Sequence, residues 1–241
     1  MKAIILQHVP FEGPGYILSW LHEKGFATDI YSVCNPEIPT PDVCSANLLI
    51  VLGGPMSVND EKTYPWLIEE KKLIKKAIDH NIPTLGICLG SQLIASVCGA
   101  KISRASEKEI GWFPVQAVPQ TSKNKKNFSF PESFISFHWH SEQFDIPINA
   151  TKIATNSVNP NQAFQIGKTV IGLQFHPEIT PYSLQTMVNH TPIELTNESY
   201  VQPAQQLLSV PTEYFIQNHR LVDKLLSYLL SKGKTKNSRH G

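Results

Sequence analysis

Residues 86–90, with the sequence GICLG, have the composition of a segment that carries an activated nucleophile. They follow an apolar run over 82–87 that predicts a buried strand, and a helical pattern begins near Leu93. A reactive side chain with a glycine two residues to either side, at a strand-to-helix junction, is typical of a nucleophile elbow. The helix would direct its free N–H groups at the sulfur and favour a thiolate. We therefore predict that Cys88 is a nucleophile and not an ordinary buried cysteine.

A nucleophilic thiolate needs a base, and the base needs a group that holds its tautomer. His176 ends an apolar strand expected over 170–175, whereas most of the nine histidines are interpreted as loop or surface residues. In an open α/β sheet, chemistry gathers at the carboxyl ends of the strands, where the elbow is also expected. Pro177 favours an extended backbone, which puts Glu178 on the same side as His176. The sequence predicts a triad of Cys88, His176 and Glu178.

Attack on an acyl carbon creates an oxyanion that needs two hydrogen-bond donors. The backbone N–H of Leu89, directly after Cys88, is one candidate. Gly54 is the second candidate, because it lies in a turn after an apolar strand expected over 48–52, and glycine lets the backbone approach closely. Gly53 is the alternative donor and is expected to lie against the substrate.

The elements that must position these residues form two halves. The first half alternates strands and helices, which indicates a parallel sheet with helices on both faces; its strands are expected at 2–7, 28–33, 48–52 and 82–87, and its clearest helix at 65–80. The second half is rich in short strands whose close spacing indicates antiparallel hairpins attached to that sheet; they are expected at 100–103, 111–118, 134–139, 152–155, 162–166 and 170–175. The predicted fold class is α/β: an open, mostly parallel, twisted sheet plus a small antiparallel sheet.

Length and composition limit the domain organisation, the partners and the cellular setting that we expect for this chain. With 241 residues the chain is expected to form a single domain with a core over about 1–190, C-terminal helices over about 191–231 and a disordered tail over about 232–241. A net charge of +1 and the lack of an eighteen-residue apolar run predict no nucleic-acid or membrane partner. The four cysteines lack CxxC spacing, and the N-terminus lacks a secretion signal, so we expect a reducing cytoplasm.

The order of the motifs resembles that of class I glutamine amidotransferases. GGP stands at 53–55, GxCxGxQ over 86–92 and HPE at 176–178, and the resemblance covers about 1–190. Stand-alone members related to the glutaminase domain of GMP synthetase are the most similar. The resemblance implies a flavodoxin-like fold and hydrolysis of the γ-carboxamide of L-glutamine, through a γ-glutamyl thioester on Cys88, with release of ammonia and without a cofactor.

The resemblance also implies residues that bind the substrate. Gln92 matches the elbow glutamine that helps to position substrate in the family. The segment HWHSEQF over 138–144 falls where the family binds glutamine, often with Ser-His-Gly-Asp, and His140, Ser141 and Glu142 take the matching positions. Glu142 is expected at the α-ammonium group and the backbone of Ser141 at the α-carboxylate.

Three functions remain open at this point. The first is a glutaminase-type subunit that passes ammonia to a separate synthetase partner. The second is a stand-alone hydrolase of other γ-glutamyl compounds, which needs the same triad and a wider pocket. The third is a catalytically silent binding or regulatory module, against which the complete triad argues. A metal site is not expected, because no carboxylate or cysteine with metal-ligand spacing accompanies His138 and His140.

Overall fold

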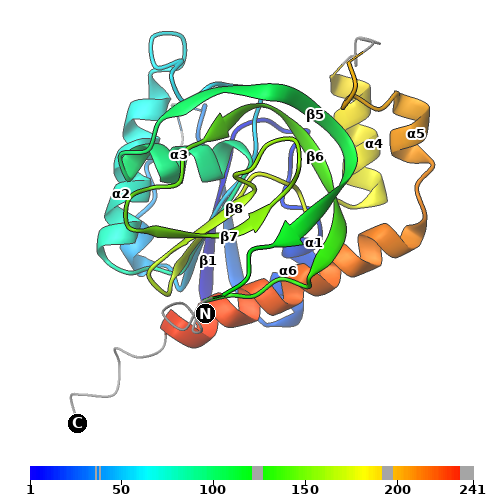
Figure 1. Ribbon diagram of the computed structural model, residues 1–241. Coiled ribbons are helices and arrows are strands. Elements are labelled where there is room, and N and C mark those ends of the chain that lie inside the picture. The colour runs from blue at the N-terminus through cyan, green and yellow to red at the C-terminus, as the bar shows by residue number, and fades with distance from the viewer. Residues whose placement is uncertain (36, 38, 121–126, 192–197, 234–241) are drawn as a thin grey trace.

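The computed structural model describes the chain except for residues 36, 38, 121–126, 192–197 and 234–241 (Figure 1). Its described strands form one nine-stranded sheet with the order β2-β1-β3-β4-β9-β8-β7-β5-β6. The predicted tail falls mostly outside these residues, except that positions 232 and 233 belong to the last helix.

The first five strands in this order are parallel. They are β2 (Ala27–Ser32), β1 (Lys2–Gln7), β3 (Leu48–Val51), β4 (Thr84–Ile87) and β9 (Val170–Leu173). Every residue of β3, β4 and β9 is buried, as expected for strands that are covered on both faces. The carboxyl ends of β3, β4 and β9 lie side by side and carry the candidate site.

The remaining strands continue the same sheet in antiparallel fashion. They are β8 (Ala163–Ile166), β7 (Ala150–Thr155), β5 (Ile102–Ala117) and β6 (Ser133–Phe144). The hairpins predicted from the sequence are therefore present, and the long β5–β6 ribbon curls back over the sheet (Figure 1). The strands expected at 100–103 and 111–118 are parts of one strand, β5, whose register against β6 shifts between Arg104 and Glu109.

Helices cover both faces of the sheet, which confirms the predicted fold class. The helices are α1 (Tyr16–Glu23), α2 (Trp66–Asp79), α3 (Leu89–Val97), α4 (Pro181–His190), α5 (Ala204–Leu208) and α6 (Thr212–Gly233), with a short 3-10 turn at Val43–Ser45. Side chains of α2 and α3 pack with Ile4 and Leu49 on one face, and side chains of α1 and α6 pack with Ile5 and Ile50 on the other. Among the described helices, none is long and apolar enough to cross a membrane.

Candidate active site

The strand-turn-helix geometry predicted for residues 86–90 is present. Cys88 stands between β4 and α3 with φ +50° and ψ −110°, a left-handed conformation that is strained for a residue with a side chain. Gly90 permits the turn, because a Cβ at this position would lie 2.0 Å from the carbonyl oxygen of Val51. The first turn of α3 is thereby pressed against the end of β3, and Cys88 is held at the carboxyl edge of the sheet.

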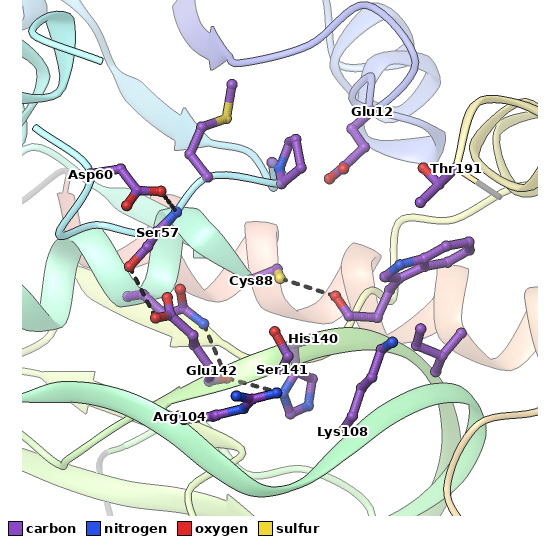
Figure 2. A pocket seen from close by; sticks show the side chains of 16 residues that line it. Glu12, Ser57, Asp60, Cys88, Arg104, Lys108, His140, Ser141, Glu142 and Thr191 are labelled. Carbon is purple, nitrogen blue, oxygen red and sulfur yellow. Dashed lines mark hydrogen bonds between the residues drawn. The ribbon is translucent and has the colours of Figure 1, made fainter. Parts of the chain in front are cut away.

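The Cys88 side chain is buried but faces a cavity (Figure 2). Its sulfur lies 3.6 Å from the carbonyl oxygen of Trp139, and the Gln174 amide nitrogen lies 3.7 Å from the same sulfur. Gln174 follows β9 and was not singled out by the sequence analysis. Its amide can donate to a sulfur anion, so the sulfur has a polar neighbour on the side of β9 as well as on the side of β6.

His176 and Glu178 form a buried pair next to Cys88. The Nδ1 atom of His176 donates to Glu178 Oε1 at 2.8 Å. Burial opposes a charged ring, but the Glu178 carboxylate and the neighbouring Cys88 side chain outweigh it and hold the pKa of His176 well above its ordinary value. The three residues of the predicted triad, which come from distant parts of the chain, are thus brought together.

A second carboxylate, which the sequence analysis missed, lies in the same place. Glu12, from the loop after β1, lines the cavity, and together with His176 it also borders a smaller neighbouring space. Burial raises the pKa of the Glu12 carboxyl, and the His176 and His8 rings offset this only in part. A Cβ on Gly53 would lie 2.5 Å from Glu12 Oε2 and 3.1 Å from His176 Cε1, so both side chains lie close to the Gly53 backbone.

The two predicted oxyanion donors border the nucleophile. Gly54 lines the cavity, and Leu89 is the first residue of α3. In the part of the chain that the structure describes, neither backbone N–H donates to a protein acceptor. The carbonyl of Gly53 points the other way and accepts a hydrogen bond from His8 Nδ1 at 2.9 Å.

The cavity has a volume of about 470 Å³ and brings the predicted substrate residues together. Gln92 donates to the carbonyl oxygen of Glu142 at 3.2 Å, and His140 Nδ1 lies 3.1 Å from the same oxygen. The Glu142 carboxylate accepts from Ser57 Oγ at 3.0 Å. The lining residues are Glu12, Gly54, Pro55, Met56, Ser57, Asp60, Cys88, Gln92, Arg104, Lys108, Ile110, Trp139, His140, Ser141, Glu142 and Thr191. Gly53 borders a smaller space behind His176 instead.

A buried carboxylate supports the β6 wall of the cavity. Glu109 lies 3.1 Å from His140 Nε2 and accepts amide hydrogen bonds of 2.6 to 3.0 Å; the amide donors are Asn156, Asn159 and Gln162. Burial alone would raise the pKa of Glu109, but the neighbouring His140 and His138 rings and the amide donor of Asn159 lower it to about 2. Within the described ranges, no group of three His, Cys, Asp or Glu side chains is placed to hold a metal ion.

The burial of two polar residues was not anticipated from the sequence. Four histidines of the described residues are buried (His8, His138, His140 and His176), and His8 is the one among them that the sequence analysis did not single out. Glu70, within the helix expected at 65–80, is 2% exposed and pairs with His8. These polar groups are buried only because strands and helices from distant parts of the chain meet.

An α/β sheet with a cysteine elbow, a histidine–carboxylate pair and an open cavity at one edge defines a class of α/β proteins with a candidate cysteine nucleophile. Comparison with known proteins identifies the family: residues 17–192 match "Glutamine amidotransferase class-I", and the chain belongs to this family. It is 30% identical over 200 residues to the glutamine amidotransferase-like protein YfeJ of Salmonella typhimurium, which covers 82% of this chain and 84% of that protein.

Another relative and a solved structure are also similar to this chain. The GMP synthase of Bacillus velezensis is 33% identical over 157 residues, which cover 62% of this chain but only 28% of that enzyme. The crystal structure of a glutamine amidotransferase from Thermotoga maritima superposes with a TM-score of 0.86 at 31% identity, and the match covers 95% of this chain and 98% of that chain. The predicted kinship with the glutaminase domain of GMP synthetase is confirmed at the level of the family.

Proposed function

We propose that the protein hydrolyses γ-glutamyl amide bonds through a thioester on Cys88, with L-glutamine as the reference substrate. The observation that carries the proposal is the joint placement of Cys88, the bonded His176–Glu178 pair and an open cavity. The Cys88 thiolate attacks the γ-carbonyl carbon, and the N–H groups of Leu89 and Gly54 stabilise the oxyanion. The intermediate collapses as the C–N bond breaks, and the His176 imidazolium gives its proton to the leaving nitrogen, so ammonia departs.

The second half of the reaction uses the same groups. His176, now neutral, takes a proton from water while the water oxygen attacks the thioester carbon. The C–S bond breaks, glutamate leaves and the thiolate–imidazolium pair is restored. Glu178 holds the His176 ring and stabilises its charge. Gln92, His140, Ser141 and Glu142 are proposed to bind the amino-acid end of the substrate, and Gly53 is proposed to lie against it.

Ammonia from this reaction would pass to a synthetase partner. Support comes from the GMP synthase relatives, in which the part that this chain matches is under a third of the enzyme. The proposed setting is the cytoplasm, because Cys34, Cys44, Cys88 and Cys98 are all free.

A second candidate substrate class is favoured by the cations of the cavity. Arg104 and Lys108 lie at the register shift of β5, on the opposite side of Cys88 from Glu12 (Figure 2). Bulges of this kind re-aim side chains near active sites. Within the described residues neither cation takes part in an ion pair. The cavity volume lies in the range of about 300–1,000 Å³ that larger ligands occupy. A γ-glutamyl amino acid, whose leaving amine carries a carboxylate, fits this arrangement.

The test measures release of ammonia from L-glutamine and of glycine from γ-glutamylglycine. The unaltered protein is expected to turn over at least one of these, and Cys88→Ala is expected to turn over neither while its thermal unfolding stays nearly unchanged. Turnover that survives Cys88→Ala would refute the assignment of the nucleophile. If the unaltered protein turns over neither substrate, alone or with cell extract that supplies a partner, the silent binding module becomes the better description.

A matched pair of substrates distinguishes glutamine from γ-glutamyl amino acids as the preferred substrate class. γ-Glutamylglycinamide differs from γ-glutamylglycine only in lacking the carboxylate of the leaving group. If Arg104 and Lys108 bind that carboxylate, replacing both with alanine should reduce the preference for γ-glutamylglycine about tenfold, chiefly through KM, because a charge-assisted hydrogen bond is lost. Lys101→Ala is the control, since Lys101 lies on the same segment outside the cavity lining. An unchanged preference would favour glutamine as the substrate.

A further inference from the structure

His8 and Glu70 form a buried ion pair behind the glycine turn that borders Cys88. His8 directly follows β1 and is 1% exposed, and Glu70 lies within α2 and is 2% exposed. The Nε2 atom of His8 lies 3.0 and 3.1 Å from the two oxygens of the Glu70 carboxylate. Burying such a pair costs desolvation free energy that hydrophobic residues of the same volume would avoid. Stability alone therefore does not explain why His8 and Glu70 are buried together.

The hydrogen bonds define the charge state of the ring. A backbone carbonyl oxygen can only accept, so His8 Nδ1 must carry a proton to bond Gly53 at 2.9 Å. An ionised carboxylate can only accept as well, so Nε2 must carry a proton to bond Glu70. With Glu70 ionised, the ring is an imidazolium. Burial opposes this charge, but Glu70 outweighs burial and raises the pKa of His8 above its ordinary value.

The hydrogen bond from His8 to the carbonyl oxygen of Gly53 orients the whole Gly53–Gly54 peptide unit. Its carbonyl belongs to the planar peptide unit whose other end is the N–H of Gly54, and in a trans peptide the two groups point in opposite directions. When the carbonyl is held on His8, the N–H is turned away from His8, and Gly54 lines the cavity that Cys88 faces. If this peptide unit were turned over, a carbonyl oxygen would face the reacting atoms and repel an oxyanion.

Two successive glycines do not hold such an orientation by themselves. Glycine populates regions of backbone conformation that other residues avoid, so the Gly53–Gly54 peptide needs an external constraint. Gly54 is confined from both sides, because a Cβ there would lie 2.9 Å from His8 Cβ and 3.0 Å from Leu89 Cδ2. Leu89 carries the other candidate oxyanion donor, so the two donors and His8 form one contact group.

We propose that His8, kept as an imidazolium by Glu70, is a positioning residue that fixes the Gly53–Gly54 peptide with its N–H directed at the oxyanion. The inference rests on the proposed function, since only a reaction with an oxyanion needs this donor. The positive charge of the His8 ring, one peptide unit away, also polarises the Gly54 N–H and strengthens this group as a hydrogen-bond donor.

Two double variants test the proposal. His8→Asn with Glu70→Gln keeps an amide donor near the position of Nδ1 and removes both charges. His8→Leu with Glu70→Leu removes the donor and fills the space with apolar groups, a replacement that buried ion pairs often tolerate. For each protein, kcat and KM are measured on the γ-glutamyl amide that the unaltered protein turns over. The rate of alkylation of Cys88 by iodoacetamide is measured in parallel, because that displacement forms no oxyanion.

The leucine pair is expected to lower kcat about 10²- to 10³-fold, as loss of an oxyanion donor does. Its KM and alkylation rate should stay within about twofold of the unaltered values, and the Asn/Gln pair should recover most of kcat. The proposal is overturned if the leucine pair keeps its kcat, or if alkylation falls together with turnover, which would indicate general distortion of the site. Absence of turnover in the unaltered protein would instead overturn the proposed function, and this inference with it.

Glu70→Gln alone provides a test that preserves volume, should the leucine pair not fold. Without Glu70 the charge on His8 is lost at a lower pH, and a neutral ring has only one N–H to share between Gly53 and position 70. The ratio of variant to unaltered kcat should therefore fall as the pH is raised from the acid range towards neutrality. Glu12 is the other charged group that acts on His8, and it is unchanged in this ratio. A ratio that is flat with pH would overturn the proposal.

Discussion

Lowering the pH should destabilise the protein through His138, a fully buried ring on β6. Its Nδ1 atom donates to the carbonyl oxygen of Ser136 at 3.0 Å. Burial lowers the pKa of His138 to about 4; Glu109 favours the charged ring, while His140 and His176 oppose it. In the unfolded chain the same ring binds its proton near pH 6.5.

These two pKa values determine whether stability rises or falls with pH. Between pH 6.5 and about 4 the unfolded state binds the proton and the folded state does not, so stability falls as the pH falls through this window. Integrated from about pH 7 to about pH 4.5, this one group removes about 2 kcal/mol from the free energy of unfolding.

The assay is urea unfolding of the unaltered protein and of His138→Asn at several pH values. The introduced amide can still donate to the Ser136 carbonyl but does not titrate. Groups common to both proteins cancel in the difference between their free energies of unfolding. The advantage of the unaltered protein should therefore shrink by about 2 kcal/mol on acidification from about pH 7 to about pH 4.5. A difference that is independent of pH, or that grows on acidification, would refute the argument.

Three further outcomes are expected. Gly90→Ala should lower the free energy of unfolding by about 3 kcal/mol or more, measured in urea, because the new Cβ would overlap the backbone of β3; a loss below about 1 kcal/mol would contradict that reading. Glu178→Ala should reduce kcat/KM less than His176→Ala does, since a residue that orients the base matters less than the base, and the reverse order would contradict the assigned roles. A glutamine-like electrophile should label Cys88 ahead of the exposed Cys34, as peptide mapping can establish; equal labelling would contradict a single activated thiol.

Features that are contiguous in sequence were predictable. The elbow over 86–90 has its glycines and cysteine in one segment, and the apolar run before it defines β4. The helix predicted over 65–80 is α2, Trp66–Asp79, because its apolar stripe recurs with the helical period. The segment 176–178 follows an apolar strand, so its place at the sheet edge could also be expected.

Features that depend on the meeting of distant elements were not predictable. The His8–Glu70 pair depends on the position of β1 next to β3 and beneath α2. No pattern within a single segment of the sequence indicates this arrangement. Glu12 and Gln174 are single polar residues without a motif, yet both lie at Cys88 or His176. The charged residues of 103–109 concealed the continuity of β5, because a strand interrupted by a bulge loses its alternation of polar and apolar residues.

The C-terminal helix α6 has a consequence for how the protein is made. Leu221, Leu225 and Leu229 belong to the same core cluster as Ala3 and Ile5 of the first strand. A ribosome that adds about 5–20 residues per second must therefore reach α6 before the part of that face that α1 leaves open is covered. During this interval the apolar side chains that α6 covers in the finished protein stay exposed, and exposed apolar surface of this kind favours aggregation of a partly synthesised chain.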